Sequence, residues 1–318
     1  MNLPVVSSLL PVVLLIAAGW VAGRRRWIAP SAVRDLSNLI FVLLAPALLF
    51  RAMSTVHLGE LSLKPVAAYF IAAGLIYGAT LALRGFNREA AVLALANTYS
   101  NTVMIGIPLI GLAYGPPGMV TLLTLVSLHS LTLLTGATVV LELASAREEA
   151  AAGHPGRRHM LATVLRAVRN AVLHPVVLPV PAGLLFAATG WTMPDAIDRP
   201  QQWLGQAFAP MALVLVGITL ASTPVGHHLR GALVQAVAKN LVHPALVLAI
   251  GWALGVRGLP LTVMVVAASM PIGANVFMFA QRYRVAEGLV TASVVVSTLL
   301  ALLTVTGAMA LMAWLAPA

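Results

Sequence analysis

Long apolar runs, separated by short connections rich in glycine, proline and arginine, follow one another along the whole chain. A helix needs about 20 mostly apolar residues to cross the hydrocarbon core of a bilayer. Reading each run against its charged or helix-breaking boundaries predicts ten transmembrane helices, which we number spans 1 to 10 in chain order. They cover residues 3–23, 31–53, 64–83, 89–113, 118–144, 165–189, 201–222, 231–254, 260–281 and 286–315.

Composition agrees with this pattern and excludes a soluble globule. The chain has 318 residues, of which 60% are hydrophobic and only 9% charged, too few polar side chains to cover a protein in water. The first apolar run is followed by Arg24, Arg25 and Arg26 and is not preceded by basic residues, the reverse of a cleavable signal peptide. We therefore predict an all-α integral membrane protein in which this run remains as span 1.

The basic residues predict the topology. The net charge of +10 would suggest a nucleic-acid partner for a soluble protein, but here the charges lie in short loops between apolar runs, so no such partner is expected. The positive-inside rule assigns the arginine-rich loops to the cytoplasm and places both termini outside it. The arginine-rich loops hold Arg24 to Arg26, Arg84, Arg88, Arg147, Arg157, Arg158, Arg166, Arg169, Arg230, Arg282 and Arg284, and the opposite loops hold Arg51, Lys64, Arg199 and Arg257.

The chain is expected to divide into two related halves. A polar cytoplasmic linker, 145–164, separates a first five-helix repeat, 1–144, from a second, 165–318. Because equivalent helices lie five spans apart, an odd number, the second half must run through the bilayer in the opposite direction, and such inverted repeats are typical of secondary carriers. Three pairs of similar short segments, which we call sequence echoes, support the repeat. They centre on Pro11 with Pro175 and Pro46 with Pro210, each pair 164 residues apart, and on Pro108 with Pro271, 163 apart.

Two spans combine a proline with an unusual density of polar side chains. Span 4 holds Asn97, Ser100 and Asn101 ahead of Gly106-Ile107-Pro108, and span 9 has Pro271 between serine and asparagine residues. Lipid offers these polar groups no partner, so they should face a polar cavity. Proline lacks an amide proton and crowds the carbonyl four residues earlier, so we expect span 4 to break at residues 106–108 and span 9 to break at Pro271.

These two broken helices, in equivalent places of inverted halves, are expected to cross at mid-bilayer. The N-terminus of a half-helix favours an anion, so we place a carboxylate near residues 107–108 and 273–275, with Asn101 and Asn275 as amide donors. In the alternative interpretation the prolines only kink their helices and the amides join neighbouring helices. The residues predicted to bind substrate are Asn97, Ser100, Asn101, Ile107, Pro108, Pro271, Gly273 and Asn275.

Ionisable residues inside spans often mark transport pathways. His129 lies in mid-span and is a candidate to carry a coupling proton, with a neutral histidine hydrogen-bonded between helices as the alternative. Glu142 is expected to reach the membrane interface, and Lys239 either compensates substrate charge or snorkels to the surface. His174 and His243 each precede a proline, which favours structural roles.

The spans offer no chemistry for an enzyme. They contain no cysteine, no pair of aspartates and no His-x-x-x-His face, so no catalytic residue, metal or cofactor is expected. An intramembrane enzyme is a distant alternative to a carrier, and a channel or passive receptor is a third class. The driving force stays open between a proton carried by His129 and the membrane potential acting on the anion.

Three segments give the chain a family resemblance. SNTVMIGIPLI at 100–110, KNLVHPALVLAIG at 239–251 and MPIGANVFMFAQRYRV at 270–285 resemble the auxin efflux carrier family, and the likeness runs from the first span to the last. That family includes plant auxin carriers and bacterial permeases for malonate or other dicarboxylates. The resemblance implies a bacterial inner-membrane protein whose partners are the bilayer, a small organic anion and, through scaffold helices, a second copy of the chain.

The resemblance also implies a mechanism. Ten helices in an inverted five-plus-five repeat, similar to bile-acid sodium symporters, would form a scaffold of spans 1, 2, 6 and 7 and a transport domain of spans 3–5 and 8–10 that moves as an elevator. Asn101 matches the asparagine of the Asn-Thr motif in span 4, and Pro108 and Pro271 match the paired crossover prolines. The chain departs from the family at Ile272 and His174, where a polar residue and an asparagine are usual. Sodium symport, the alternative mechanism, is disfavoured because no acidic residue stands near Pro271.

Overall fold

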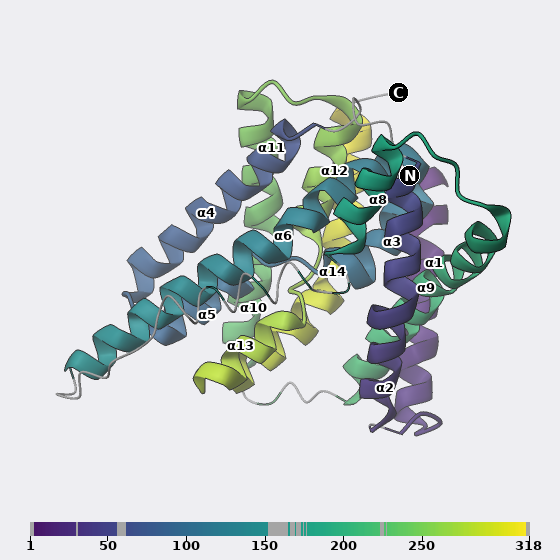
Figure 1. The fold of residues 1–318 in the computed structure, drawn as a ribbon. Coiled ribbons are helices and arrows are strands. Elements are labelled where there is room, and N and C mark those ends of the chain that lie inside the picture. Colours follow the sequence, from purple (N-terminus) through teal and green to yellow (C-terminus); the bar gives the residue numbers. More distant parts are fainter. Residues whose placement is uncertain are drawn as a thin grey trace.

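The computed structural model describes residues 3–29, 31–55, 62–151, 177–222 and 228–315, together with single residues at 165, 169, 173, 175 and 226. Within these ranges all regular structure is helical (Figure 1). In chain order the helices are α1 (Leu3–Arg24), α2 (Ala32–Asn38), η1 (Leu39–Leu44), α3 (Ala45–Ser54), α4 (Lys64–Arg84), α5 (Arg88–Ala96), η3 (Thr102–Gly106), α6 (Ile107–Ala151), α8 (Pro179–Ala188), α9 (Asp195–Ser222), α10 (Leu229–Val237), η4 (Ala238–Val242), α11 (His243–Ala253), α12 (Gly258–Ser269), α13 (Asn275–Tyr283) and α14 (Glu287–Leu315).

These helices follow the predicted spans closely. Six segments of the described chain are long and apolar enough to cross a bilayer, and three shorter apolar helices accompany them. The boundary expected between spans 4 and 5 is a kink inside α6 at Gly115, whose φ of 60° and ψ of −156° depart from helical values ahead of two prolines. Helix α6 continues to Ala151, well into the segment predicted as a linker, and residues 152–164 lie outside the described residues. Of span 6, only the second half is described as a helix, and His174 lies outside the described residues.

Each of three helices carries a π turn just ahead of a proline. The π turns η1, η3 and η4 end two residues before Pro46, Pro108 and Pro244 respectively. A proline cannot donate to the carbonyl four residues back, and a π turn shifts the preceding hydrogen bonds to the carbonyl five residues back. The extra residue therefore accommodates the proline without ending the helix.

The helices form two bundles, which Figure 1 shows side by side. The first bundle contains α1, α2, η1, α3, α8 and α9, with α1 packed along α9 and α3 packed against α8 and α9. The second bundle contains α4, α5, η3, α6 and α10 to α14. Apolar side chains of both, such as Ile16 of α1 and Leu122 of α6, belong to one hydrophobic core. The seam between the bundles is therefore apolar.

Glycines allow the helices of the first bundle to touch. A Cβ atom at Gly19 of α1 would lie 2.0 Å from the carbonyl oxygen of Val214 of α9, and one at Gly183 of α8 would lie 2.6 Å from that of Phe50 of α3. Gly183 follows Gly19 by 164 residues, and Val214 follows Phe50 by the same 164. The two contacts thus repeat at the offset of the sequence echoes. Small residues promote close helix packing in membranes, where the hydrophobic effect does not distinguish side chains from lipid.

The close approach of α1 and α9 predicts a large difference between two glycine-to-alanine substitutions. A Cβ atom at Gly217 would lie 2.0 Å from the Ile16 carbonyl oxygen, whereas one at Gly74 of α4 would meet nothing within 4 Å. We expect Gly217→Ala to lower the free energy of unfolding by about 1–3 kcal/mol, because the backbones must separate. Gly74→Ala should leave stability unchanged or raise it slightly, because alanine favours helix. Thermal unfolding of the purified protein measures both, and equal midpoints would contradict the packing described.

Candidate functional site

Two interrupted helices meet at one point in the second bundle. The first interruption, residues 97–101, separates α5 from η3 and α6, and the second, residues 270–274, separates α12 from α13. The amide of Asn101 donates to the Pro271 carbonyl at 2.8 Å, and the amide of Gly273 donates to the Tyr99 carbonyl at 2.9 Å. These bonds flank an isolated antiparallel bridge between Ser100 and Ile272. The two breaks therefore cross, and each supplies backbone partners that the other has lost.

The expected break position is confirmed at Pro271 and wrong in the first helix. Residues 106–108 do not interrupt it, because the π turn η3 carries the chain past the proline: Gly106 donates to the Asn101 carbonyl and Ile107 to that of Thr102. Ile107 and Pro108 are buried in the first turn of α6. The break itself falls earlier, where Asn97, Ser100 and Asn101 offer side-chain partners that compete with helical bonding. Pro108 and Pro271 are thus not equivalent in position, since only Pro271 lies in the crossing.

Tyr99 organises one side of the crossing. Its hydroxyl lies 2.8 Å from the Ser130 hydroxyl of α6 and accepts a hydrogen bond of 3.1 Å from the amide of Asn275. The ring covers Gly273 so closely that a Cβ atom there would lie 2.7 Å from it. Asn275, predicted to bind substrate, is thus held at the start of α13 and remains partly exposed.

A second tyrosine joins the crossing to α6. The Tyr69 hydroxyl of α4 lies 2.6 Å from the Ser100 hydroxyl and 3.1 Å from Nε2 of His129. The His129 ring lies between Tyr69 and Tyr99, with centroids 5.5 and 4.5 Å away. Ser100 is buried in this network and does not line an open approach. His129 is likewise buried, as its hydrogen-bonded interpretation requires.

The two asparagines of the first interruption have different surroundings. Asn97 is buried and donates from its amide to the Thr80 hydroxyl of α4 at 3.2 Å, while its Oδ1 has no partner among the described residues. Asn101 is partly exposed, and its Oδ1 accepts from the Met104 amide, which caps η3. The cap uses the oxygen of Asn101 and leaves its amide group as a donor at the surface of the crossing.

Two of the ionisable residues differ from expectation. Glu142 does not extend to the protein surface: it is buried and accepts a 2.8 Å hydrogen bond from the Tyr283 hydroxyl of α13. Lys239 does not snorkel either. It is fully buried in η4, and its ammonium donates to the carbonyls of Ala268 and Met270, at the end of α12. His243, one turn further on, packs against the Tyr69 ring at 4.8 Å and is also fully buried.

Helix dipoles give the crossing a defined polarity. Helices η3 and α13 begin within a few residues of the paired segments 99–101 and 271–273, and α5 and α12 end there. The first amides of a helix and its dipole attract an anion, and the last carbonyls attract a cation. Lys239 donates hydrogen bonds to the carbonyls at the end of α12. The partly exposed Asn101 and Asn275 lie at the N-termini of η3 and α13. The N-terminal side is therefore the one suited to a carboxylate.

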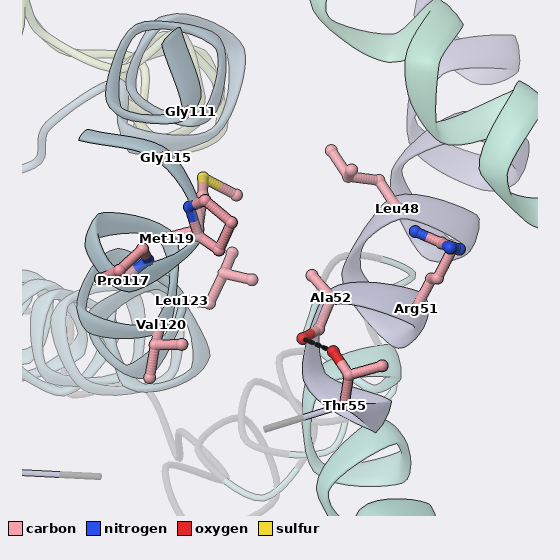
Figure 2. A pocket seen from close by; sticks show the side chains of 11 residues that line it. Leu48, Arg51, Ala52, Thr55, Gly111, Gly115, Pro117, Met119, Val120 and Leu123 are labelled. Carbon is pink, nitrogen blue, oxygen red and sulfur yellow. Dashed lines mark hydrogen bonds between the residues drawn. The ribbon is translucent and has the colours of Figure 1, made fainter. Parts of the chain in front are cut away.

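A cavity of about 660 Å³ lies between the bundles, lined by α3 and by residues of α6 on both sides of the kink at Gly115. Figure 2 shows Leu48 and Ala52 of α3 on one wall and Met119 and Leu123 of α6 on the other. The lining is mostly apolar, and its one charged member among the described residues, Arg51, forms a two-bond pair with Asp198 of α9. Sequence reasoning did not find this cavity.

Sequence reasoning also missed both tyrosines. Tyr69 lies in an apolar stretch of span 3, and a hydroxyl buried in lipid needs a partner, which is the signal that was available for it. Tyr99 lies within the polar run of span 4, but nothing in the spacing reveals that its hydroxyl reaches Asn275, 176 residues away.

An apolar multi-helix protein with two broken helices crossing inside one bundle has the architecture of a membrane transporter. A family model described as "Membrane transport protein" matches residues 4–309, and the chain belongs to this family, the auxin efflux carrier family.

A protein of Rhizobium meliloti (strain 1021), provisionally assigned as a malonate transporter, is 30% identical over 95% of this chain and 94% of its own length. Auxin efflux carrier component 8 of Arabidopsis thaliana is 23% identical over 64% and 65% of the two chains, and the uncharacterized transporter YfdV of Escherichia coli (strain K12) is 23% identical over 92% and 93%. The protein is thus a multi-pass membrane transporter.

The tyrosine network predicts a selective loss of stability. Tyr69→Phe leaves the Ser100 hydroxyl and the His129 nitrogen without their shared partner in a buried site, so we expect the free energy of unfolding to fall by about 1–3 kcal/mol. Tyr114→Phe is the matched control, because the Tyr114 hydroxyl has no hydrogen-bond partner among the described residues. Thermal unfolding in detergent compares the variants, and an equal effect of both would show that the hydrogen bonds of Tyr69 contribute nothing specific.

Proposed function

We propose that the protein is a secondary carrier for a small organic anion, which binds at the crossing of the two interrupted helices. The observation that carries this proposal is the reciprocal backbone pairing of residues 99–101 with residues 271–273, which brings the N-termini of η3 and α13 to one place. Two half-helix N-termini at one point form a site for negative charge that needs no basic side chain.

A carboxylate is the anion that fits these groups best. The amides of Asn101 and Asn275 stand at the two N-terminal ends and are partly exposed, so each can donate to a carboxylate oxygen. The names of two relatives point to the same chemical class, since malonate and auxin are both carboxylates. We therefore infer a malonate-like or auxin-like substrate. Ile107 and Pro108, buried beyond the π turn, support the helix and do not contact the substrate in this proposal.

The two halves are proposed to be an inverted five-plus-five repeat, 1–144 and 165–318, joined by the linker at 145–164. The contacts of Gly19 with Val214 and of Gly183 with Phe50 support this proposal. Adding 164 to Gly19 of the first contact gives Gly183 of the second, and subtracting 164 from Val214 gives Phe50, so the same contact occurs twice with the roles of the two halves reversed. Ten spans place both termini on the same side of the membrane, and the arginine-rich loops assign that side to the outside of the cytoplasm in this proposal.

The movement that we propose is an elevator, with the first bundle as a fixed scaffold and the second bundle as the transport domain. The side-chain hydrogen bonds described above that join different helices each connect two members of the same bundle: Arg51 with Asp198 in the first, and the tyrosine, lysine and glutamate contacts in the second. The seam between bundles is apolar and contains the 660 Å³ cavity. One bundle can therefore slide along the other without breaking any of these hydrogen bonds. A second copy of the chain is proposed to pack on the scaffold.

In this proposal His129 does not exchange protons directly with an open pathway. Its Nε2 faces the Tyr69 hydroxyl, and the rings of Tyr69 and Tyr99 enclose it. If a proton accompanies the anion, it reaches His129 through Tyr69. The alternative driving force is the membrane potential, worth about 2.3 kcal/mol per charge per 100 mV.

Uptake of labelled malonate into proteoliposomes tests the binding site. We expect Asn101→Ala and Asn275→Ala each to weaken apparent affinity about tenfold or more, since each removes a hydrogen bond to a charged group. Asn38→Ala, on the exposed face of α2 in the first bundle, is the matched control and should transport like the unaltered protein. Unchanged affinity in both crossing variants, with folding retained, would rule out the site. Recovery of malonate in altered form would point to an enzyme.

Paired cysteines test the elevator, and the chain contains no cysteine of its own. Ala52→Cys with Met119→Cys places one thiol on each wall of the cavity, one in each bundle. We expect a cleavable bifunctional thiol reagent that joins them to stop most uptake, and cleavage to restore it. Arg51→Cys with Asp198→Cys is the control, because both positions lie in the first bundle, so cross-linking them should leave uptake intact. Full uptake by the cross-linked inter-bundle pair would contradict relative movement of the bundles.

A further inference from the structure

Lys239 is a buried cationic side chain with an unusual set of partners. It is 0% exposed, and its Nζ donates to the Ala268 carbonyl and, at 2.9 Å, to the Met270 carbonyl. Both carbonyls belong to the end of α12, directly before Pro271 of the crossing. None of the ion pairs between described residues includes Lys239. Among the described residues, the hydrogen-bond partners of its Nζ are thus backbone carbonyls alone.

This arrangement is that of a small monovalent cation bound at a broken helix. Where a membrane helix is interrupted, the last carbonyls of the first half lack amide partners and carry the negative end of the helix dipole, and they can coordinate an alkali cation. In this chain the lysine side chain brings its own cation to those carbonyls. The Nζ atom lies where such a cation would sit, within hydrogen-bond distance of both carbonyls.

The surroundings hold the ammonium in place. Asn240, the next residue, donates to the Ser297 carbonyl of α14 at 2.8 Å, and the Ser297 hydroxyl accepts from the Ile272 amide at 3.1 Å. Ser297 of α14 therefore holds η4 and the second interruption in fixed positions relative to each other. At the opposite interruption the Thr98 carbonyl accepts, from the described residues, the neutral hydroxyl of Tyr69 at 3.4 Å. The crossing is electrostatically asymmetric, with one fixed cation on the α12 side.

We propose that the Lys239 ammonium occupies a site for a monovalent cation, so that the protein needs no alkali cation to keep its second interruption folded, and that removing the side chain creates a site for a free small cation. The tethered cation travels with the second bundle, so it contributes no net ion movement to transport. This inference deepens the proposed carrier function, on which its meaning for transport rests. Its test uses stability without any substrate, so either idea can fail alone.

The experiment measures the unfolding midpoint of the purified full-length protein at constant ionic strength in choline, sodium, potassium or methylammonium chloride. The unaltered protein should unfold at the same midpoint in all four salts. Lys239→Ala, which leaves space, should unfold earlier in choline and recover by about 3 °C or more in at least one of the smaller cations. Lys239→Met, which fills the space without a charge, should unfold earlier in every salt and not recover.

The control is Lys64→Ala, which removes an exposed lysine at the start of α4 and should behave like the unaltered protein. A midpoint of the unaltered protein that rises in sodium relative to choline would overturn the proposal, because it would reveal a separate alkali site. A Lys239→Ala variant with the same midpoint in all four salts would also overturn it. If that variant does not fold, Lys239→Met decides: stability equal to that of the unaltered protein would show that the carbonyls need no ammonium.

Discussion

The structure depends on one constraint of the bilayer, that every interrupted backbone must find its partners inside the protein. The two breaks satisfy it together, because Asn101 pairs with Pro271 and Gly273 pairs with Tyr99. The carbonyls left over at the α12 end receive Lys239, and the Ile272 amide receives a serine hydroxyl from α14. A crossing of this kind is thus stabilised by many elements at once, which explains why so many polar contacts of the second bundle converge on it.

The outline of the fold was readable from the sequence because its causes are local. Apolar length sets the spans, and several described helices, such as α4 and α14, begin and end within a residue or so of the expected boundaries. The position of the first break was not readable from Pro108, because a π turn can absorb a proline and the sequence gives little sign of one. The same device at Pro46 and Pro244 shows that a proline alone does not locate an interruption in this chain.

The site was predictable in part: the sequence indicated where the backbone segments cross, but not which side chains pair there. A polar run beside a proline predicts a polar crossing, and Ser100, Asn101, Pro271 and Gly273 do meet there. The partners of their side chains come from helices far away in sequence, as with Tyr69 for Ser100, and no local pattern encodes such distances. For the same reason the burial of Lys239 and Glu142 was not foreseen, since each is hydrogen-bonded by a partner from another segment.

The apolar seam between the bundles has a consequence for the speed of any relative motion. A boundary with directional polar contacts would hold the bundles in discrete positions, each contact adding to the barrier. None of the side-chain hydrogen bonds described above crosses the boundary of aliphatic side chains, so only its packing beside the cavity at α3 must change when the bundles shift. In the movement proposed above, the barrier then comes from this repacking and from the surrounding lipid, so the thickness and fluidity of the bilayer should affect the turnover rate together with the residues of the seam.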